Sequence, residues 1–269
     1  MKKISVIVLT ATLFNIKIMF AQDSIFVYPS AAEVDEKVNC KVIKEENSLK
    51  FVYLINNSVE SKQSIQRFMI DIFTELWNIE SPVGWNGKKL TIKNVVSWST
   101  YDSSNYILPS GQLDNFNYRS NYILGISHYY IHGYIKIPYF EFGEVPEKIV
   151  NDDIFENSKQ GLTIGPKDLP NPFVISEFID TISYYISRSF ELGWIKDEQT
   201  RDKYISYINN VKEKEEIGDS EEARNILDKI MNEAETDSLE KITSEAFALI
   251  YYNAEYLKSQ ISGVLSVPR

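Results

Sequence analysis

The chain has 269 residues, of which 43% are hydrophobic and 13% aromatic, a composition typical of a folded globular protein and not of a disordered one. Its formal charge of −10 at pH 7 argues against a nucleic-acid partner, because phosphate binding requires clustered Lys and Arg. A single cysteine, Cys40, cannot form an internal disulfide, and its alternating surroundings, EKVNCKVIK, predict a buried position on a strand.

Residues 1–22 have the pattern of an export signal. Lys2 and Lys3 precede the apolar run ISVIVLTATLF, and Ala21 offers a small residue for cleavage. We therefore expect a protein that is secreted, periplasmic or on the cell surface. No later segment approaches the ~20 apolar residues needed to span a bilayer, so no membrane span is expected after signal removal.

Residues 23–164 alternate with the period of β-strands. Runs rich in β-branched and aromatic residues, separated by segments rich in Gly, Pro, Asn and Ser, occur at 49–55, 64–73, 90–98 and 129–137. No helical pattern of about ten residues separates them, as parallel strands would require. We predict an antiparallel, immunoglobulin-like β-sandwich, in which two sheets enclose one core.

The hydrophobic period changes to 3.6 after a segment rich in Gly and Pro, 165–173, which we interpret as a linker. Four amphipathic helices are predicted. The first covers about 175–192, the second 198–215 and the fourth 244–261, and the third begins after a cap at Asp219 or Ser220. Gly193 and Gly218 are expected to end helices, and Asp197 to begin one. Residues 174–262 therefore predict an antiparallel four-helix bundle, and the fold class is α+β with two domains.

The run FIDTISYYISRSFELGWIKDEQ and its continuation to AEYL resemble the FIMAH-type helical module of bacterial secreted proteins. The shared elements are GWI at 193–195, YIxxI in the second helix, GDSEEA…IL in the third and ITSEA…L…AEYL in the fourth. The resemblance covers about residues 174–262 and implies a non-catalytic accessory module joined to an exported partner domain. The stretch VSWSTYDSSNYILPSGQLDNFNYRSN is similar to part of extracellular bacterial β-sandwich domains.

Candidates for catalysis or metal binding are few. His128 and His132 lie four residues apart on a predicted strand, which separates them by ~13 Å and is too far for one zinc ion. We interpret both as solvent-facing. The best local carboxylate cluster, Asp152, Asp153 and Glu156, is interpreted as a polar loop. We therefore expect no catalytic, metal-binding or cofactor-binding residues, and no cofactor.

Tryptophans are the remaining candidates for ligand binding. Trp98 alternates with Val96 and is predicted to lie in the core. Trp77 and Trp85 lie near turns, where an indole either packs under a loop or stays exposed and stacks on a sugar or peptide. These two residues are the candidate ligand-binding positions.

The sequence thus predicts an exported, non-catalytic protein for extracellular or cell-envelope interaction, with an unknown extracellular protein or glycan as its partner. One alternative is a small secreted hydrolase that acts on glycans through a carboxylate pair. The other is a structural spacer or assembly element.

Overall fold

The computed structural model of the chain describes residues 25–27, 30–136, 148–150 and 154–261. The predicted export signal, Asp152 and Asp153 lie outside the described residues. Two short strands, β1 (Ile25–Val27) and β10 (Lys148–Val150), pair in parallel and belong to one unit of the chain. The other described strands and all described helices form a second unit.

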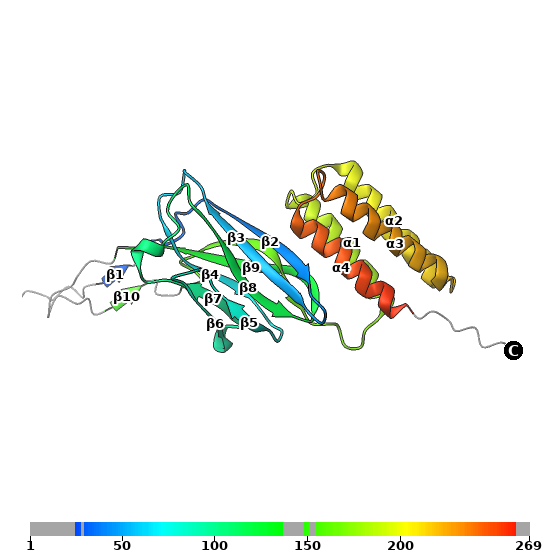
Figure 1. Cartoon of the computed structure of the whole chain (residues 1–269), viewed down its shortest axis with the longest axis horizontal. Helices are drawn as coiled ribbons and strands as arrows, with labels where there is room; N and C mark the ends of the chain where they lie inside the picture. The colour runs from blue at the N-terminus through cyan, green and yellow to red at the C-terminus, as the bar shows by residue number, and fades with distance from the viewer. Residues whose placement is uncertain (1–24, 28–29, 137–147, 151–153, 262–269) are drawn as a thin grey trace, which may run out of the picture. The chain divides into compact units, whose positions relative to one another are not determined.

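The strands of the second unit form two antiparallel sheets (Figure 1). The four-stranded sheet has the order β2-β3-β8-β5, with strands β2 (Glu36–Lys44), β3 (Leu49–Asn57), β8 (Gln112–Ser120) and β5 (Trp77–Glu80). The five-stranded sheet has the order β11-β9-β4-β7-β6, with strands β11 (Lys159–Lys167), β9 (Ile123–Gly133), β4 (Ile65–Asp71), β7 (Val95–Ser99) and β6 (Asn86–Leu90). Two of the neighbouring pairs, β2–β3 and β6–β7, are consecutive in the chain, and their short connections are possible because the pairs are antiparallel.

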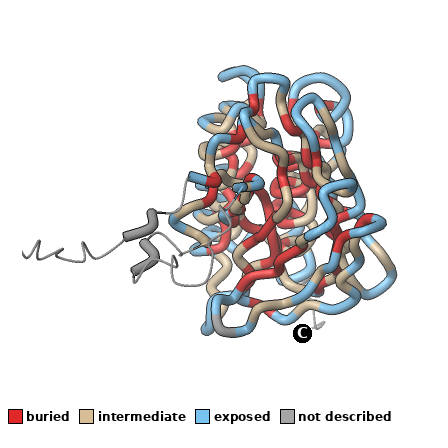
Figure 2. Tube along the Cα trace, turned by 90° about the vertical axis from the view of Figure 1, so that its left-hand side faces the viewer, coloured by how far each residue is buried: buried red, intermediate tan, exposed pale blue. Residues whose placement is uncertain are grey.

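One aromatic core joins the two sheets. The ring of Tyr53 on β3 lies 5.6 Å from Phe68 on β4, and the ring of Trp98 on β7 stacks 6.2 Å from Tyr118 on β8. All four side chains are fully buried, which confirms the predicted core position of Trp98. Buried residues follow the interior of the chain trace, and exposed residues its turns (Figure 2). The two sheets therefore pack face to face.

Two of the predicted strands differ from those observed. Within 90–98, residues Thr91–Lys93 form a 3₁₀ turn, and Asn94 takes a left-handed conformation with φ of 51°, so the strand begins only at Val95. The strand predicted at 129–137 begins earlier, at Ile123. Gly125 lies in this earlier part, where a Cβ atom would come within 2.6 Å of the Tyr185 hydroxyl. Glycine here marks close packing and not a turn.

The predicted linker, 165–173, overlaps β11, which continues to Lys167 and pairs with β9 along its whole length. The Gly-rich and Pro-rich composition of this segment suggested a linker, but the glycines of β11 are required for close contacts with β9. A Cβ atom at Gly161 would lie 2.3 Å from the ring of Tyr129, and one at Gly165 would lie 2.8 Å from the Ser127 hydroxyl. Proline is tolerated at Pro166 because β11 is an edge strand.

The four predicted helices are confirmed as α1 (Ile175–Glu191), α2 (Glu198–Glu216), α3 (Ser220–Asp237) and α4 (Ser244–Gln260). Gly193 and Gly218 follow α1 and α2 with φ of 71° and 77°, the left-handed conformation expected after a helix. Asp197 caps α2 by accepting a hydrogen bond of 2.7 Å from the Thr200 amide, and Asp219 caps α3.

Each helix packs against two others, in the pairs α1–α2, α2–α3, α3–α4 and α4–α1. Helix α4 also packs against β2, β9 and β11. Its residues Ala246 and Ile250 are part of the helical core, whereas Ala248 and Leu249 belong to the core of the sheets. Among the described residues, no helix is both long and apolar enough to cross a membrane.

Helix α4 also forms hydrogen bonds with backbone atoms of β2 and β9. The Cys40 amide on edge strand β2 donates to Glu245 at 2.6 Å, and the Tyr252 hydroxyl donates to the Val42 carbonyl at 3.3 Å. The side chain of Asn253 donates to the Leu124 carbonyl and accepts from the Leu124 amide. The predicted boundary between the β half and the helical half therefore lies inside one compact unit.

Candidate functional site

A cleft of about 450 Å³ lies where the C-terminal part of α4 meets the sheets. Its walls are the β2–β3 turn with one strand residue on each side (44–49), the β8–β9 turn with the first two residues of β9 (121–124) and, on α4, Tyr252, Asn253, Glu255, Tyr256 and Ser259. Its volume falls within the range of about 300–1,000 Å³ that is typical of small-molecule sites. Because three separate parts of the chain build the cleft, it exists only in the folded unit.

Strand pairing brings the two turns together. Leu49, the first residue of β3, is the register partner of Ser120, the last residue of β8. The β2–β3 turn before Leu49 and the β8–β9 turn after Ser120 therefore lie at the same end of the four-stranded sheet. The β2–β3 turn is closed by a hydrogen bond of 2.8 Å from the Glu45 amide to the Ser48 carbonyl.

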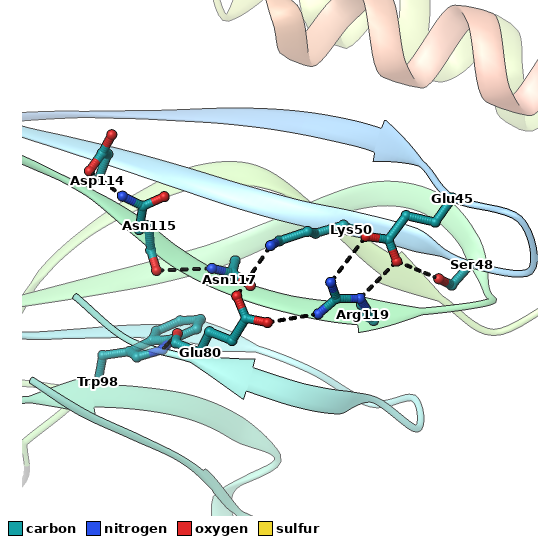
Figure 3. Close-up of polar contacts among 9 residues, drawn as sticks. All are labelled: Glu45, Ser48, Lys50, Glu80, Trp98, Asp114, Asn115, Asn117 and Arg119. Carbon is teal, nitrogen blue, oxygen red and sulfur yellow. Dashed lines mark hydrogen bonds and ion pairs between the residues drawn. The ribbon is translucent and has the colours of Figure 1, made fainter. Parts of the chain in front are cut away.

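An ionic network on the four-stranded sheet holds the β2–β3 turn (Figure 3). The guanidinium of Arg119 donates to both carboxylate oxygens of Glu45, at 2.7 and 3.1 Å, and to Glu80 at 3.0 Å. Lys50 also donates to Glu80, at 3.2 Å. The hydrogen bonds from Arg119 lower the pKa of both carboxyls below their ordinary value. Glu45 therefore stays ionised and is held in place.

The opposite wall is held by contacts of α4. Lys44 forms an ion pair with Glu255 at 2.5 Å, and both residues line the cleft. The ring of Tyr256 packs edge-on against Phe173 and Phe178, with centroids 5.9 and 5.6 Å apart. Both walls are thus fixed by contacts within the protein itself.

The remaining polar groups of the cleft are available for other contacts. Within the described part of the chain, five lining side chains form no side-chain hydrogen bond or ion pair: those of Glu46, Asn47, Asn121, Tyr122 and Tyr256. They include two amides, two phenols and one carboxylate. The cleft therefore combines fixed walls with unused donors and acceptors.

The two candidate tryptophans lie in different environments. Trp77 on β5 is 39% exposed and is the register partner of Arg119, so its indole lies on the same face of the sheet as the ionic network. Trp85 is only 7% exposed, donates from Nε1 to the Asn105 carbonyl at 2.9 Å and packs edge-on against Phe116. Trp85 is thus packed under a loop, and its indole presents no exposed face to a ligand. Neither tryptophan lines the cleft.

The other residues considered from the sequence lie elsewhere. His128 is exposed, 3.7 Å from the Asp71 carboxylate, and His132 is half-buried with Nδ1 3.1 Å from the Ser158 hydroxyl. Glu156 is exposed on the segment before β11. Among the residues that the structure describes, no three His, Cys, Asp or Glu side chains are grouped as metal ligands would be. Cys40 is buried, and burial raises the pKa of its thiol well above the ordinary value.

The half-buried position of His132 predicts an effect of pH on stability. Burial, with a smaller contribution from the positive charge of Arg67, lowers the pKa of His132 from 6.5 to about 4. The unfolded chain therefore binds a proton between these pH values that the folded chain does not, and stability is lost as pH falls. We expect urea unfolding midpoints to fall less steeply across this range for His132→Gln than for the unsubstituted protein. Equal slopes for the two proteins would contradict the prediction.

No family model matches the chain, and no match was found among curated proteins.

Proposed function

We propose that the chain is an exported, non-catalytic binding protein that acts in extracellular or cell-envelope interaction, and that the cleft holds its ligand. The observation that carries this proposal is that some polar side chains of the cleft hold its walls while others remain available to a ligand. Glu45 and Glu255 are engaged in ion pairs that hold the walls, whereas Asn47, Asn121 and Tyr122 keep unused donors and acceptors. A site with fixed walls loses little conformational freedom when a ligand binds, which favours affinity.

The ion pairs also bear on the hydrolase alternative. A glycosidase needs one carboxyl with a raised pKa that can donate a proton. In the cleft, the pKa of Glu45 is lowered by Arg119, which suits a structural carboxylate and not a proton donor. The direction of this shift therefore argues against Glu45 as the proton donor of a hydrolase.

In this proposal the two sheets are an immunoglobulin-like sandwich and the helices are a FIMAH-type module. Antiparallel face-to-face sheets and four helices whose ends agree with the motif positions support this assignment. The basic and apolar pattern of residues 1–22 supports export. The helical module then contributes directly to recognition, because α4 builds one wall of the cleft.

The proposal is tested by filling the cleft. Labelled protein is incubated with envelope and extracellular material of the producing cells, and the retained fraction is measured. Ser259→Trp places an indole from an exposed position of α4 into the cleft and is expected to abolish retention. Val83→Trp, at a position 95% exposed and outside the cleft, is the matched control and should retain normally. Lack of retention of the unsubstituted protein, or equal retention of both variants, would overturn the proposal.

A further inference from the structure

We propose that the ligand of the cleft is a short, neutral oligosaccharide, an inference that rests on the binding function proposed above. The five unused side chains point to this class. An amide offers both donors and an acceptor, and a phenol is at once donor and acceptor, whereas a carboxylate only accepts. The amides of Asn47 and Asn121 and the phenols of Tyr122 and Tyr256 therefore match hydroxyl groups, each of which also donates and accepts.

The charges of the cleft favour a neutral ligand over a charged one. Glu45 is neutralised by Arg119, and Glu255 by Lys44. Among the charged side chains that line the cleft, only Glu46 has no cationic partner within the described residues. An anion would be repelled by Glu46, and a strongly basic peptide would find one available carboxylate. The carboxylate of Glu46 is instead suited to accept hydrogen bonds from neutral hydroxyls. The negative charge of the acceptor makes such hydrogen bonds stronger.

The apolar part of the lining suits the C–H faces of sugar rings. Leu49, Ile123 and the ring of Tyr122 all line the cleft, and all three are at most half-exposed. A sugar ring has weakly polar C–H faces and a rim of hydroxyls, so it needs apolar surface and polar groups side by side. Aromatic rings with a polar end provide both in one residue.

The retention experiment described above tests the ligand class when the envelope material is first divided into three portions. One portion is treated with periodate, which cleaves vicinal diols and destroys most sugars, one with protease, and one is left untreated. We expect periodate, and not protease, to abolish the retention that Ser259→Trp also abolishes. Retention that survives periodate and is lost after protease would overturn the oligosaccharide proposal and leave the binding function standing. Absence of retention on untreated material would instead overturn the binding function itself.

Substitutions within the cleft test the named contacts. Tyr122→Ala and Asn121→Ala should each weaken retention about tenfold, the loss expected for one well-made contact. Tyr101→Ala is the matched control, because Tyr101 is 83% exposed and lies outside the cleft. Equal retention of Tyr122→Ala and Tyr101→Ala would contradict the proposal.

Discussion

Replacement of Asn253 by alanine is expected to lower the free energy of unfolding by about 3 kcal/mol or more. Asn253 is buried on α4, where its amide group donates to the Leu124 carbonyl at 3.1 Å and accepts from the Leu124 amide at 3.3 Å. Leu124 needs this partner because the pairing of β9 with β4 extends only from Gly133 to Tyr129. Its partner on the other side, Pro166, has no amide to donate. Alanine would leave both buried groups of Leu124 without a hydrogen bond.

Urea unfolding checks this prediction, with the slope of the transition unchanged and the midpoint lowered. The matched control is Asn225→Ala on α3, because Asn225 is exposed and, among the residues that the structure describes, its side chain bonds only to Glu222. We expect that control to change stability by less than about 0.5 kcal/mol. Equal midpoints for Asn253→Ala and Asn225→Ala would mean that α4 does not support β9 in this way.

Replacement of Trp98 by alanine is expected to cost about 4 kcal/mol, because it leaves a large cavity at the centre of the core. The indole is fully buried and stacks on Phe68 at 5.4 Å and on Tyr118 at 6.2 Å, so it contacts residues of both sheets. Its Nε1 also donates to the Glu80 carbonyl at 2.9 Å, which ties the core to the strand that carries one member of the ionic network.

The substitution Trp98→Phe separates the contribution of the packed ring from that of the hydrogen bond. Phenylalanine keeps an aromatic ring in the core but loses the hydrogen bond to Glu80, so about 1–3 kcal/mol is expected from the unpaired carbonyl. The measurement is again urea unfolding, with Trp77→Ala as a tryptophan control at a position 39% exposed. A loss for Trp98→Ala no larger than that for Trp77→Ala would show that the core does not depend on the indole as described.

The helices were predictable because their signals are local. The glycines that follow α1 and α2, Gly193 and Gly218, act through their own left-handed conformation. Asp197 acts through a hydrogen bond to Thr200, three residues further on, and such short-range relationships are visible in a sequence. The strand β11 was not recognised for the opposite reason. Its Gly161 and Gly165 are required by the side chains of Tyr129 and Ser127 on β9, and those contacts depend on a strand pairing that the sequence does not give.

The cleft was missed because its residues come from segments that are far apart in the chain. Glu46, Tyr122 and Tyr256 are brought together by the register of β3 with β8 and by the docking of α4. One signal of that docking was present in the sequence. The run SEAFALIYYNAEYL has apolar or aromatic residues around most of the helix, which indicates a helix covered on more than one side. Two buried polar residues within it, Glu245 and Asn253, form hydrogen bonds to strands.

The docking of α4 on β2 also bears on how the protein avoids self-association. An edge strand with free amides and carbonyls is a template on which another chain can add a strand, and natural proteins block such edges. Here the carboxylate of Glu245 accepts a hydrogen bond from the Cys40 amide, and the Tyr252 hydroxyl donates one to the Val42 carbonyl. Helix α4 therefore blocks strand pairing at the middle of β2. Helix α4 thus covers part of one sheet edge, and a chain without it would leave these groups of β2 free to pair with its own copies.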